Sequence, residues 1–404
     1  MIRTRSNSER FAENLGLRQG LLKWGLFLAL AITLALTGGP LLAALHLPVA
    51  DFSAYWAAAR LQLEKADPYS PEQLLERQQA IGGSEFHPFL NPPWSLALLI
   101  PFGLFEYPVS RLLFLIMSLL ALAICANRLW RHYGGTTSER WVAQLLTFAF
   151  FPVLWTLNLG QMTPFVLLGV VGFLICVRAE KWLGAGAWLF LASLKPHVLY
   201  LIWPAVGLWA LRQKRAGVFL GGAIAMGAAS LVVLATHPSV LQDFLVFSKS
   251  LDQALFRHSN PALGTLLRVL FGLEKHSLQY LPMLGGGLWF VFHWIRNRRD
   301  WNWDRQLPLL ILVSLCTSGY VWIHDDPLLL VPGVSLAAGI CLGGRTRLIV
   351  AFFAVWLTTN GLTLVLNLAR FGDLWFVWLA PAWLGIFLAL PAGKLSKNKG
   401  KPAA

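Results

Sequence analysis

The sequence has little charge, and acidic residues are the scarcer kind. Only 13% of its 404 residues are charged, with 19 acidic residues against 33 Lys and Arg. Apolar residues make up 56%, and runs long enough to cross a bilayer recur along the chain. This composition excludes an ordinary soluble protein. The sequence predicts an all-α, polytopic membrane protein.

Cysteine is also scarce, and its placement excludes two uses. The four cysteines lie far apart within apolar segments, at Cys125, Cys176, Cys316 and Cys341. Their spacing matches neither a metal-binding motif nor an obvious disulfide. We therefore expect them to pack as small apolar residues.

The excess of positive charge is informative because of where it lies. A net charge of +14 could indicate a polyanionic partner such as nucleic acid. Most Lys and Arg residues, however, fall in segments that would share one side of a membrane, whereas Asp and Glu do not follow that pattern. Such a bias marks the cytoplasmic side. The sequence thus predicts contact with membrane lipids, no nucleic-acid partner, and both termini in the cytoplasm.

The apolar runs predict about twelve transmembrane crossings. The range 93–128 is ambiguous, because it holds two apolar pieces joined by Glu106-Tyr107-Pro108. Treating it as one net crossing with a re-entrant first piece places every strongly basic loop on the cytoplasmic side. The expected spans are 24–45, 93–128, 141–157, 163–178, 183–194, 198–211, 217–235, 278–295, 307–323, 327–343, 347–366 and 374–391.

These spans are predicted to form one membrane domain, 24–391, without internal repeats. A basic cytoplasmic arm, 1–23, precedes it, and a basic cytoplasmic tail, 392–404, follows it. The apolar run from Trp24, about 20 residues long, is too long for the core of a signal peptide and is typical of an uncleaved anchor. The main outer loops are expected at 46–92 and 236–262.

The first outer loop contains most of the longest polar interval, residues 50–101. Aromatic and apolar residues recur at helical spacing over Ser53–Glu64, which predicts an amphipathic helix lying flat on the membrane surface with one aromatic face. Asp67-Pro68-Tyr69 ends it. Ser70 then caps a second helix that has Pro71 at its first position. A proline-rich and aromatic return to the bilayer follows, as Phe86-His87-Pro88-Phe89 and Asn91-Pro92-Pro93-Trp94.

Two charged residues at the ends of apolar segments could carry chemistry. Asp51 directly precedes the first predicted helix, so it is either the N-cap of that helix or a general base at the mouth of a cavity. Lys195 ends the apolar segment 184–194, where a charge costs about 2.5–3.5 kcal/mol. It either extends to the outer interface or serves as a cation facing a phosphate. Short spans at such joints predict that the cavity opens outward.

The motif His324-Asp325-Asp326 lies between two predicted spans. A histidine with two carboxylates could ligate a metal, but three consecutive residues in a turn rarely converge on one ion. We instead expect His324 to point into the cavity and one Asp to cap the following helix.

Two further groups of polar residues are candidates. Asn158 and Gln161 lie in a tight turn, where their amides either satisfy backbone groups or bind sugar hydroxyls. In the second outer loop, Arg257 and His258 are expected to be surface charges. Arg268 is less easily explained in that way, because apolar residues flank it on both sides.

In their order along the chain, these motifs resemble glycosyltransferase family 87, whose members have the GT-C membrane fold and use polyprenyl-phosphate sugars. The resemblance covers nearly the whole chain. It rests on Asp51 after the first span, the helix with Tyr55, Asp67-Pro68-Tyr69, Asn91-Pro92-Pro93, Gly160-Gln161, Lys195-Pro196, Asn260, Arg268 and His324-Asp325. One departure is Phe89-Leu90 before Asn91, where a Tyr would be expected, and it leaves the role of Asn91 open.

The resemblance implies a hexosyl- or pentosyltransferase of the cytoplasmic membrane with its active site facing outside. It would move a monosaccharide, mannose first and arabinofuranose in some members, from a polyprenyl phosphate to a lipid or glycan acceptor, with inversion. Asp51 matches the family's acidic base, and His324 its active-site histidine. The donor phosphate would face Lys195 and Arg268. Sugar and acceptor contacts are expected from Tyr55, Asn158, Gln161, Asn260 and Asp325.

A donor with a single phosphate does not require a metal ion, so no metal and no cofactor are expected. Other function classes predict different features. A transporter or flippase of lipid-linked sugars would share the cavity and the cations but would need access from both faces, ideally with internal repeats. A ligase that moves a whole glycan would favour a much larger outer loop rich in Arg. A non-catalytic scaffold would leave Asp51, Lys195 and His324 unexplained.

Overall fold

The computed structural model describes residues 49–249, 260–343 and 346–390, all of which belong to one compact unit. Several expectations lie outside these residues, namely the arm 1–23, the span 24–45, Arg257, His258 and the tail 392–404. The described residues contain helices and no strand, which confirms the all-α prediction.

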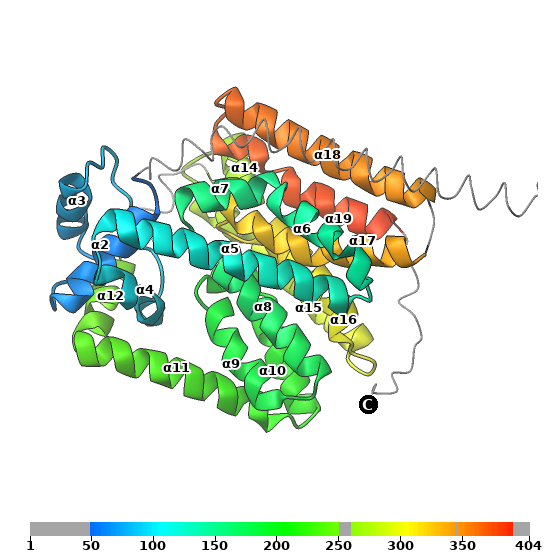
Figure 1. Ribbon diagram of the computed structural model, residues 1–404, viewed down its shortest axis with the longest axis horizontal. Helices are drawn as coiled ribbons and strands as arrows, with labels where there is room; N and C mark the ends of the chain where they lie inside the picture. The colour runs from blue at the N-terminus through cyan, green and yellow to red at the C-terminus, as the bar shows by residue number, and fades with distance from the viewer. Residues whose placement is uncertain (1–48, 250–259, 344–345, 391–404) are drawn as a thin grey trace, which may run out of the picture. The chain divides into compact units, whose positions relative to one another are not determined.

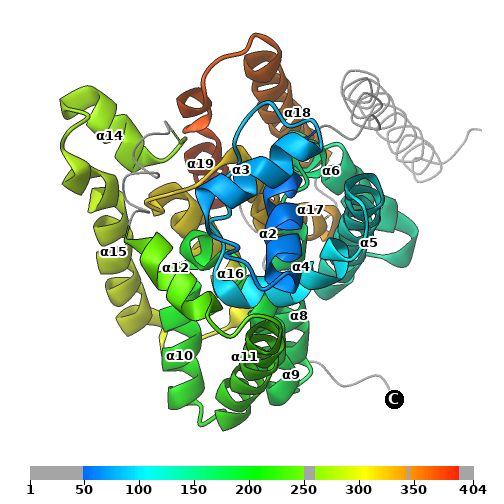
Figure 2. The same cartoon turned by 90° about the vertical axis from the view of Figure 1, so that its left-hand side faces the viewer.

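The helices follow one another with short connections (Figures 1 and 2). In chain order they are α2 (Phe52–Leu63), α3 (Pro71–Ala80), η2 (Pro93–Ser95), α4 (Leu96–Gly103), α5 (Tyr107–His132), η3 (Thr137–Glu139), α6 (Arg140–Phe148), α7 (Phe151–Leu159), α8 (Thr163–Arg178), α9 (Trp182–Ala192), η4 (Pro196–Leu199), α10 (Ile202–Arg212), α11 (Ala216–Thr236), α12 (Val240–Ser248), α14 (Leu263–Phe271), η5 (His276–Tyr280), α15 (Leu281–Asn297), α16 (Trp303–Thr317), η6 (Ile323–Leu329), α17 (Leu330–Leu342), α18 (Thr346–Leu368), η7 (Asp373–Phe376) and α19 (Leu379–Ala389).

Length and apolar character identify the helices that could cross a membrane. Among the described residues four qualify alone: Tyr107–His132, Ala216–Thr236, Ile323–Leu342 and Thr346–Leu368. The pair Thr137–Phe148 and Phe151–Leu159 qualifies together but is bent by 60°. Other apolar helices are shorter than a bilayer is thick. The figure of about twelve crossings therefore stays a prediction.

The ambiguous range 93–128 is divided between two helical segments. Pro93–Gly103 is short, and α5 begins after Glu106 and runs for 26 residues. The short segment packs against α2, and a Cβ on Gly103 would lie only 2.9 Å from the carbonyl carbon of Ala59. Its length fits a re-entrant piece better than a crossing. Whether this range crosses once stays a prediction.

The first predicted helix exists, as α2, but it does not lie on a surface. Ten of its 12 residues are buried, including the consecutive small residues Ala57, Ala58 and Ala59. Phe52 packs against Phe102 and Phe114, and α2 as a whole contacts α3, α4, α5 and α11 (Figure 2). The expectation of a flat amphipathic helix with one aromatic face is therefore wrong. Alanine adds little to an apolar pattern in the sequence, yet its small side chain lets a neighbouring backbone approach closely.

The second predicted helix, α3, begins as its capping residues indicate. The hydroxyl of Ser70 accepts a hydrogen bond from the backbone N–H of Gln73 at 3.3 Å, and Pro71 occupies the first turn. This confirms the prediction from the sequence, which depended only on neighbouring residues.

Four helices, α5, α8, α9 and α11, pack one against the next (Figure 1). Glycine lets α9 and α11 approach closely. A Cβ on Gly186 would lie 1.9 Å from the carbonyl oxygen of Val218, and one on Gly221 would lie 1.9 Å from that of Leu183. No side chain fits at such distances, so both positions require glycine. Small residues at helix contacts are typical of membrane bundles.

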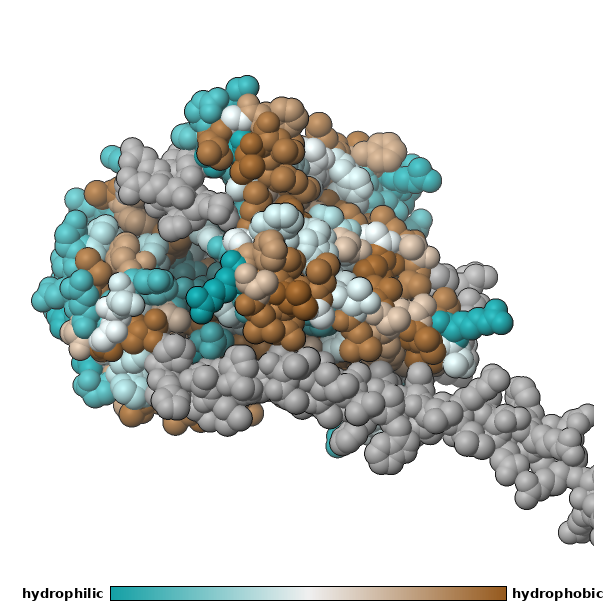
Figure 3. All heavy atoms as spheres, turned by 90° about the horizontal axis from the view of Figure 1, so that it is seen from above, coloured by the Kyte–Doolittle hydropathy of each residue, from teal (hydrophilic) through white to brown (hydrophobic). Residues whose placement is uncertain are grey.

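Large apolar side chains remain exposed on several helices, and Figure 3 shows apolar residues gathered over broad areas of one face. Residues more than half exposed include Leu120 on α5, Leu231 on α11, Leu288 on α15 and Val365 on α18. Extended apolar surface favours association in water, but it is what contact with lipid tails requires. The surface and the long apolar helices together indicate a multi-pass membrane protein.

The contact between α9 and α11 can be tested with one substitution. Gly221→Val would bring a side chain against the Leu183 carbonyl and separate the two helices. We expect a loss of stability of about 1–3 kcal/mol or more, seen as a lower melting temperature in detergent. Gly227→Val is the control, because it lies on the same helix with no atom within 4 Å of its Cβ position. Equal effects of the two variants would contradict the close contact.

Candidate active site

Asp51 occupies the N-cap position of α2, but its carboxylate does not cap the helix. Its Oδ2 accepts a hydrogen bond from Nε2 of Gln161 at 2.6 Å. Its Oδ1 lies 3.1 Å from Nδ1 of His87. The capping interpretation of Asp51 is therefore wrong. The carboxylate instead joins the start of α2 to two distant parts of the chain.

Opposing influences determine the charge of Asp51. Burial alone would raise the pKa of its carboxyl group. The hydrogen bond from His87, the charge of His324 and the hydrogen bond from Gln161 outweigh burial, and together they hold the pKa below its usual value. Asp51 is therefore a carboxylate at neutral pH.

A tight turn after α7 presents Gln161 to Asp51. Gly160 ends α7 with φ +74°, and a Cβ there would lie 2.7 Å from Cβ of Phe52, so only glycine fits. Gln161 accepts a hydrogen bond from the Tyr55 hydroxyl at 2.7 Å while it donates to Asp51. The amide thus connects Tyr55 and Asp51. It is nearly buried, which leaves little of it open to a sugar.

Arg111 supports the same turn and was not expected from the sequence. Its Nη2 donates to the carbonyl oxygens of Leu157 and Asn158, both at 2.7 Å, at the negative end of the α7 dipole. The guanidinium lies 5.8 Å from the Phe52 ring centre and is almost fully buried. The sequence signal that could have indicated Arg111 is a single Arg within an apolar segment, one turn after the start of α5. Asn158 therefore takes part through its backbone, and a role for its half-buried side chain stays a prediction.

Lys195 forms a buried ion pair with Asp325. Its Nζ lies 2.6 Å from Oδ1 of Asp325, and the two side chains are 6% and 1% exposed. The expectation that Lys195 could extend to the interface is therefore wrong. Asp325, expected at a sugar, holds this cation instead. Its Oδ2 also accepts the backbone N–H of Trp322 at 2.9 Å, which stabilises the start of η6, the helix that contains the motif. The helix that follows, α17, has Leu329 at its N-cap, so the expectation that one Asp caps the following helix is wrong.

His324 lies close to the charged groups named above. Its backbone carbonyl accepts a hydrogen bond from the Thr156 hydroxyl at 3.1 Å, and its ring stacks on Trp322 with centroids 6.0 Å apart. The charges of Lys195, Asp325 and Asp51 all act on the imidazole. The structure therefore brings Asp51, Lys195 and His324 into one neighbourhood.

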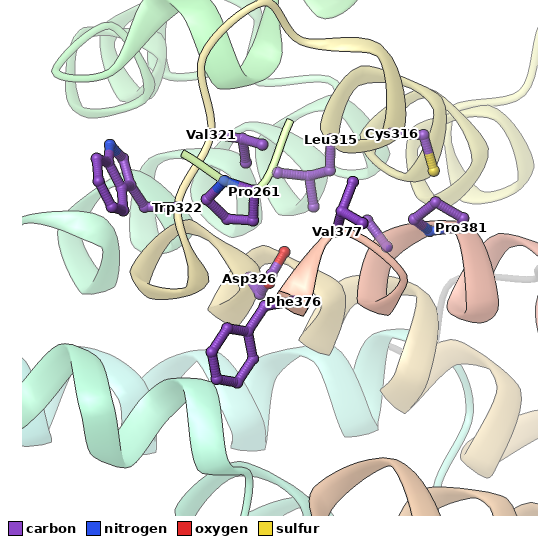
Figure 4. A pocket seen from close by; sticks show the side chains of 10 residues that line it. Pro261, Leu315, Cys316, Val321, Trp322, Asp326, Phe376, Val377 and Pro381 are labelled. Atoms are coloured by element: carbon purple, nitrogen blue, oxygen red, sulfur yellow. The ribbon is translucent and has the colours of Figure 1, made fainter. Parts of the chain in front are cut away.

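Asp326 lines a pocket that neither of its two neighbours in the motif lines. Figure 4 shows its carboxyl group among apolar side chains of a small pocket, which has room for about one water molecule. The pocket is lined by Pro261, Leu315, Cys316, Val321, Trp322, Asp326, Phe376, Val377, Ala380 and Pro381. The three motif residues thus have three different surroundings. Within the described residues, no group of three or more His, Cys, Asp or Glu side chains is arranged to hold a metal ion.

Asn91, whose role the sequence left open, joins the first loop to the segment before Lys195. Its Nδ2 donates to the carbonyl oxygen of Leu194 at 3.0 Å, and Trp94 Nε1 donates to that of Ser193 at 3.2 Å. The Asn91 carbonyl accepts the Tyr69 hydroxyl at 2.9 Å. The Asn-Pro-Pro motif therefore positions backbone that leads directly into Lys195.

Asn260 and Arg268 form a second network around α14. Asn260 Oδ1 accepts from the Ala262 N–H at 3.2 Å and from the Thr265 hydroxyl at 3.0 Å. Arg268 donates twice to the Leu273 carbonyl, at 2.7 and 3.1 Å, and once to Gln279 at 3.2 Å. These bonds hold the connection from α14 to η5. Roles toward sugar or phosphate stay predictions for both residues.

His87 is the second residue that sequence reasoning missed at this site. Its motif, Phe86-His87-Pro88-Phe89, was noted as part of the return to the bilayer, but no chemistry was assigned to the imidazole. The contact with Asp51 joins residues near the two ends of the first loop, with α2 and α3 between them, so no local pattern indicates it.

Comparison with known proteins adds one match. The family model described as glycosyltransferase family 87 matches residues 89–318. No curated protein and no solved structure matches the chain. The matched segment includes Gln161 and Lys195, whereas Asp51, His87 and His324 lie outside it.

The buried ion pair generates a stability prediction. Lys195→Met leaves Asp325 charged and unpaired, and we expect a loss of about 3–5 kcal/mol, measured by thermal unfolding in detergent. The double variant Lys195→Met/Asp325→Leu should recover much of that loss, because neither charge is then buried.

The exposed pair Arg60–Glu106 is the comparison, because the Glu106 side chain is 82% exposed. Glu106→Gln should cost less than about 1 kcal/mol. A Lys195→Met variant as stable as Glu106→Gln would contradict the buried pair.

Proposed function

This chain belongs to glycosyltransferase family 87, and we propose that it moves one sugar, mannose in the first instance, from a polyprenyl phosphate to a lipid or glycan acceptor. Family membership alone does not identify the reacting residues, and one further observation supports the proposed mechanism. An ionised carboxylate, Asp51, is held by Gln161 and His87, and both Asp51 and the Lys195 ammonium act on the His324 side chain. A base near a cation is the combination that transfer from a phosphate needs.

In the proposed reaction the acceptor oxygen attacks the anomeric carbon on the face opposite the phosphate, so the configuration inverts. The carbon–oxygen bond to the phosphate breaks, and the phosphate keeps the electron pair. Asp51 acts as the general base for the hydroxyl proton, a contribution of roughly 10²–10⁴-fold. Positive charge develops on the sugar ring in the transition state, as in glycoside hydrolysis.

The departing phosphate is assigned to the cationic side of the site. Lys195 is the principal candidate, with His324 and Arg268 as the others. Because Asp325 already neutralises Lys195, a phosphate would share the ammonium with that carboxylate rather than meet an isolated charge. A single phosphate needs no metal ion in this scheme, and no cofactor is proposed.

The sugar-side residues divide into two groups. Tyr55 donates to Gln161, and Gln161 donates to Asp51, which supports a role for both in positioning the base more than in binding a sugar. Asn158 has its side chain half-buried and remains a proposed sugar contact. Asn260 is engaged in the turn before α14, so a contact with the acceptor would require part of that network to open.

The membrane arrangement is also part of the proposal. We place the enzyme in the cytoplasmic membrane as a single GT-C-like domain over 24–391, with about twelve crossings and both termini in the cytoplasm. The site then faces outside, where a polyprenyl-phosphate sugar presents its headgroup. A flippase of lipid-linked sugars is less well supported, because the family matched is one of glycosyltransferases.

Asp51→Asn tests the base directly. The amide keeps the shape of the side chain but cannot take a proton, so transfer of labelled mannose from polyprenyl-phosphate mannose in membrane vesicles should fall by about 10²–10⁴-fold. Asp67→Asn, in the same loop, is the control. Asp67 accepts the Tyr69 N–H at 2.8 Å, which an Asn oxygen can also do, and its activity should stay near wild type. Near-normal turnover by Asp51→Asn would remove Asp51 as the base.

Gly160→Ala tests the turn that presents Gln161. The new Cβ would press against Phe52 and move Gln161 from Asp51, so we expect a lower kcat with little change in the KM for donor. Gly82→Ala is the matched control, because Gly82 also has a positive φ, +86°, but has no atom within 4 Å of its Cβ position. Equal activity of the two variants would show that the turn does not position the site.

A further inference from the structure

The backbone of His87 is fixed by two hydrogen bonds to one buried side chain. Its backbone N–H donates to Oε1 of Gln78 at 2.9 Å, and its carbonyl oxygen accepts from Nε2 of the same amide at 2.7 Å. Gln78 is fully buried on α3. Pro88 further restricts the backbone of the residue before it. One buried amide thus fixes both backbone groups of His87.

The imidazole ring is oriented in turn by Asp51. Nδ1 lies 3.1 Å from Oδ1, and a carboxylate at that distance places the ring proton on Nδ1. The other ring nitrogen, Nε2, has no hydrogen-bonding partner in the part of the chain that the structure describes. The His87 side chain is 21% exposed, whereas Gln161, which donates to the other carboxylate oxygen of Asp51, is buried.

Asp51 and His87 differ in the contacts that they already make. Both carboxylate oxygens of Asp51 accept contacts, one from Gln161 and one from His87. Burial raises the pKa of Asp51, but the bond from His87, the charge of His324 and the bond from Gln161 leave that pKa lowered. Nε2 of His87 keeps an unused lone pair. A carboxylate on one ring nitrogen and an open lone pair on the other is the arrangement of an oriented base.

We propose that His87 is a catalytic residue, whose Nε2 receives the hydroxyl proton of the acceptor while Asp51 orients the ring and stabilises the imidazolium. The inference rests on the proposed function, because it assigns the proton of glycosyl transfer. It differs from direct proton transfer to Asp51 only in which of the two contacting residues receives the proton.

Atoms and charges balance in this step. The acceptor oxygen forms its bond to the anomeric carbon, the bond from that carbon to the phosphate oxygen breaks, and the phosphate takes the electron pair. The hydroxyl proton moves to Nε2. It then passes to water at the exposed edge of the ring, which returns the pair to its starting state.

Chemical rescue provides the decisive experiment. His87→Ala and His87→Gln, assayed in vesicles with labelled polyprenyl-phosphate mannose, should lose about 10²-fold or more in kcat. Added imidazole should restore part of the His87→Ala rate in a saturable way. It should not stimulate Asp51→Asn, in which the orienting carboxylate is absent. Melting temperatures near wild type establish that the variants fold, and His87→Gln retains the size of the side chain.

His237→Ala is the matched control. His237 also contacts a carboxylate, with Nε2 2.7 Å from Oδ2 of Asp243, but it lies at the end of α11 and is assigned no part in the reaction. Its activity should be unaffected by imidazole.

Two outcomes would overturn the assignment of His87. One is a folded His87→Gln enzyme whose rate is within a few-fold of wild type. The other is a loss of rate that imidazole does not restore in His87→Ala, which would make His87 a structural residue. Failure of the proposed function appears separately, as a wild-type enzyme that transfers nothing from the mannose donor, and it would remove both proposals.

Discussion

The burial of α2 is the constraint on which the site depends. The helix fits inside the protein because it contains consecutive small alanines and because Gly103 and Gly160 leave room for its backbone. That position brings Asp51 to Gln161 and His87. On a membrane surface the same carboxylate would be solvated. It would then lack the fixed geometry and the neighbouring residues that allow it to take part in a reaction.

Charges inside the protein are stabilised in three different ways. Lys195 has a full countercharge in Asp325, and Asp51 is held by a neutral amide and an imidazole. Arg111 relies on carbonyl dipoles at the end of α7, and its Nε and Nη1 have no partner in the described residues. A low dielectric strengthens each of these interactions and penalises their loss. The more weakly compensated groups, Asp51 and Arg111, both adjoin the Gly160–Gln161 turn.

Local features could be predicted from the sequence, and contacts between distant segments could not. The start of α3 depends on Ser70 and Pro71, which are neighbours, so its cap was predictable. The family was also predictable, because its motifs keep their order along the chain. Lys195 was recognised as needing a partner, but no pattern indicates Asp325, 130 residues away. The aromatic spacing of α2 suggested one buried face, and only the packing of its alanines shows that the opposite face is buried too.

The segment from His87 to Trp94 touches Asp51 at one end and the carbonyls before Lys195 at the other. The length of this segment therefore helps to set the distance between the side of the site that takes a proton and the side assigned to phosphate. An insertion or deletion within it would change that distance while the reacting residues themselves stayed the same. Divergence toward a larger or smaller sugar therefore has a route through loop length, without any change in chemistry.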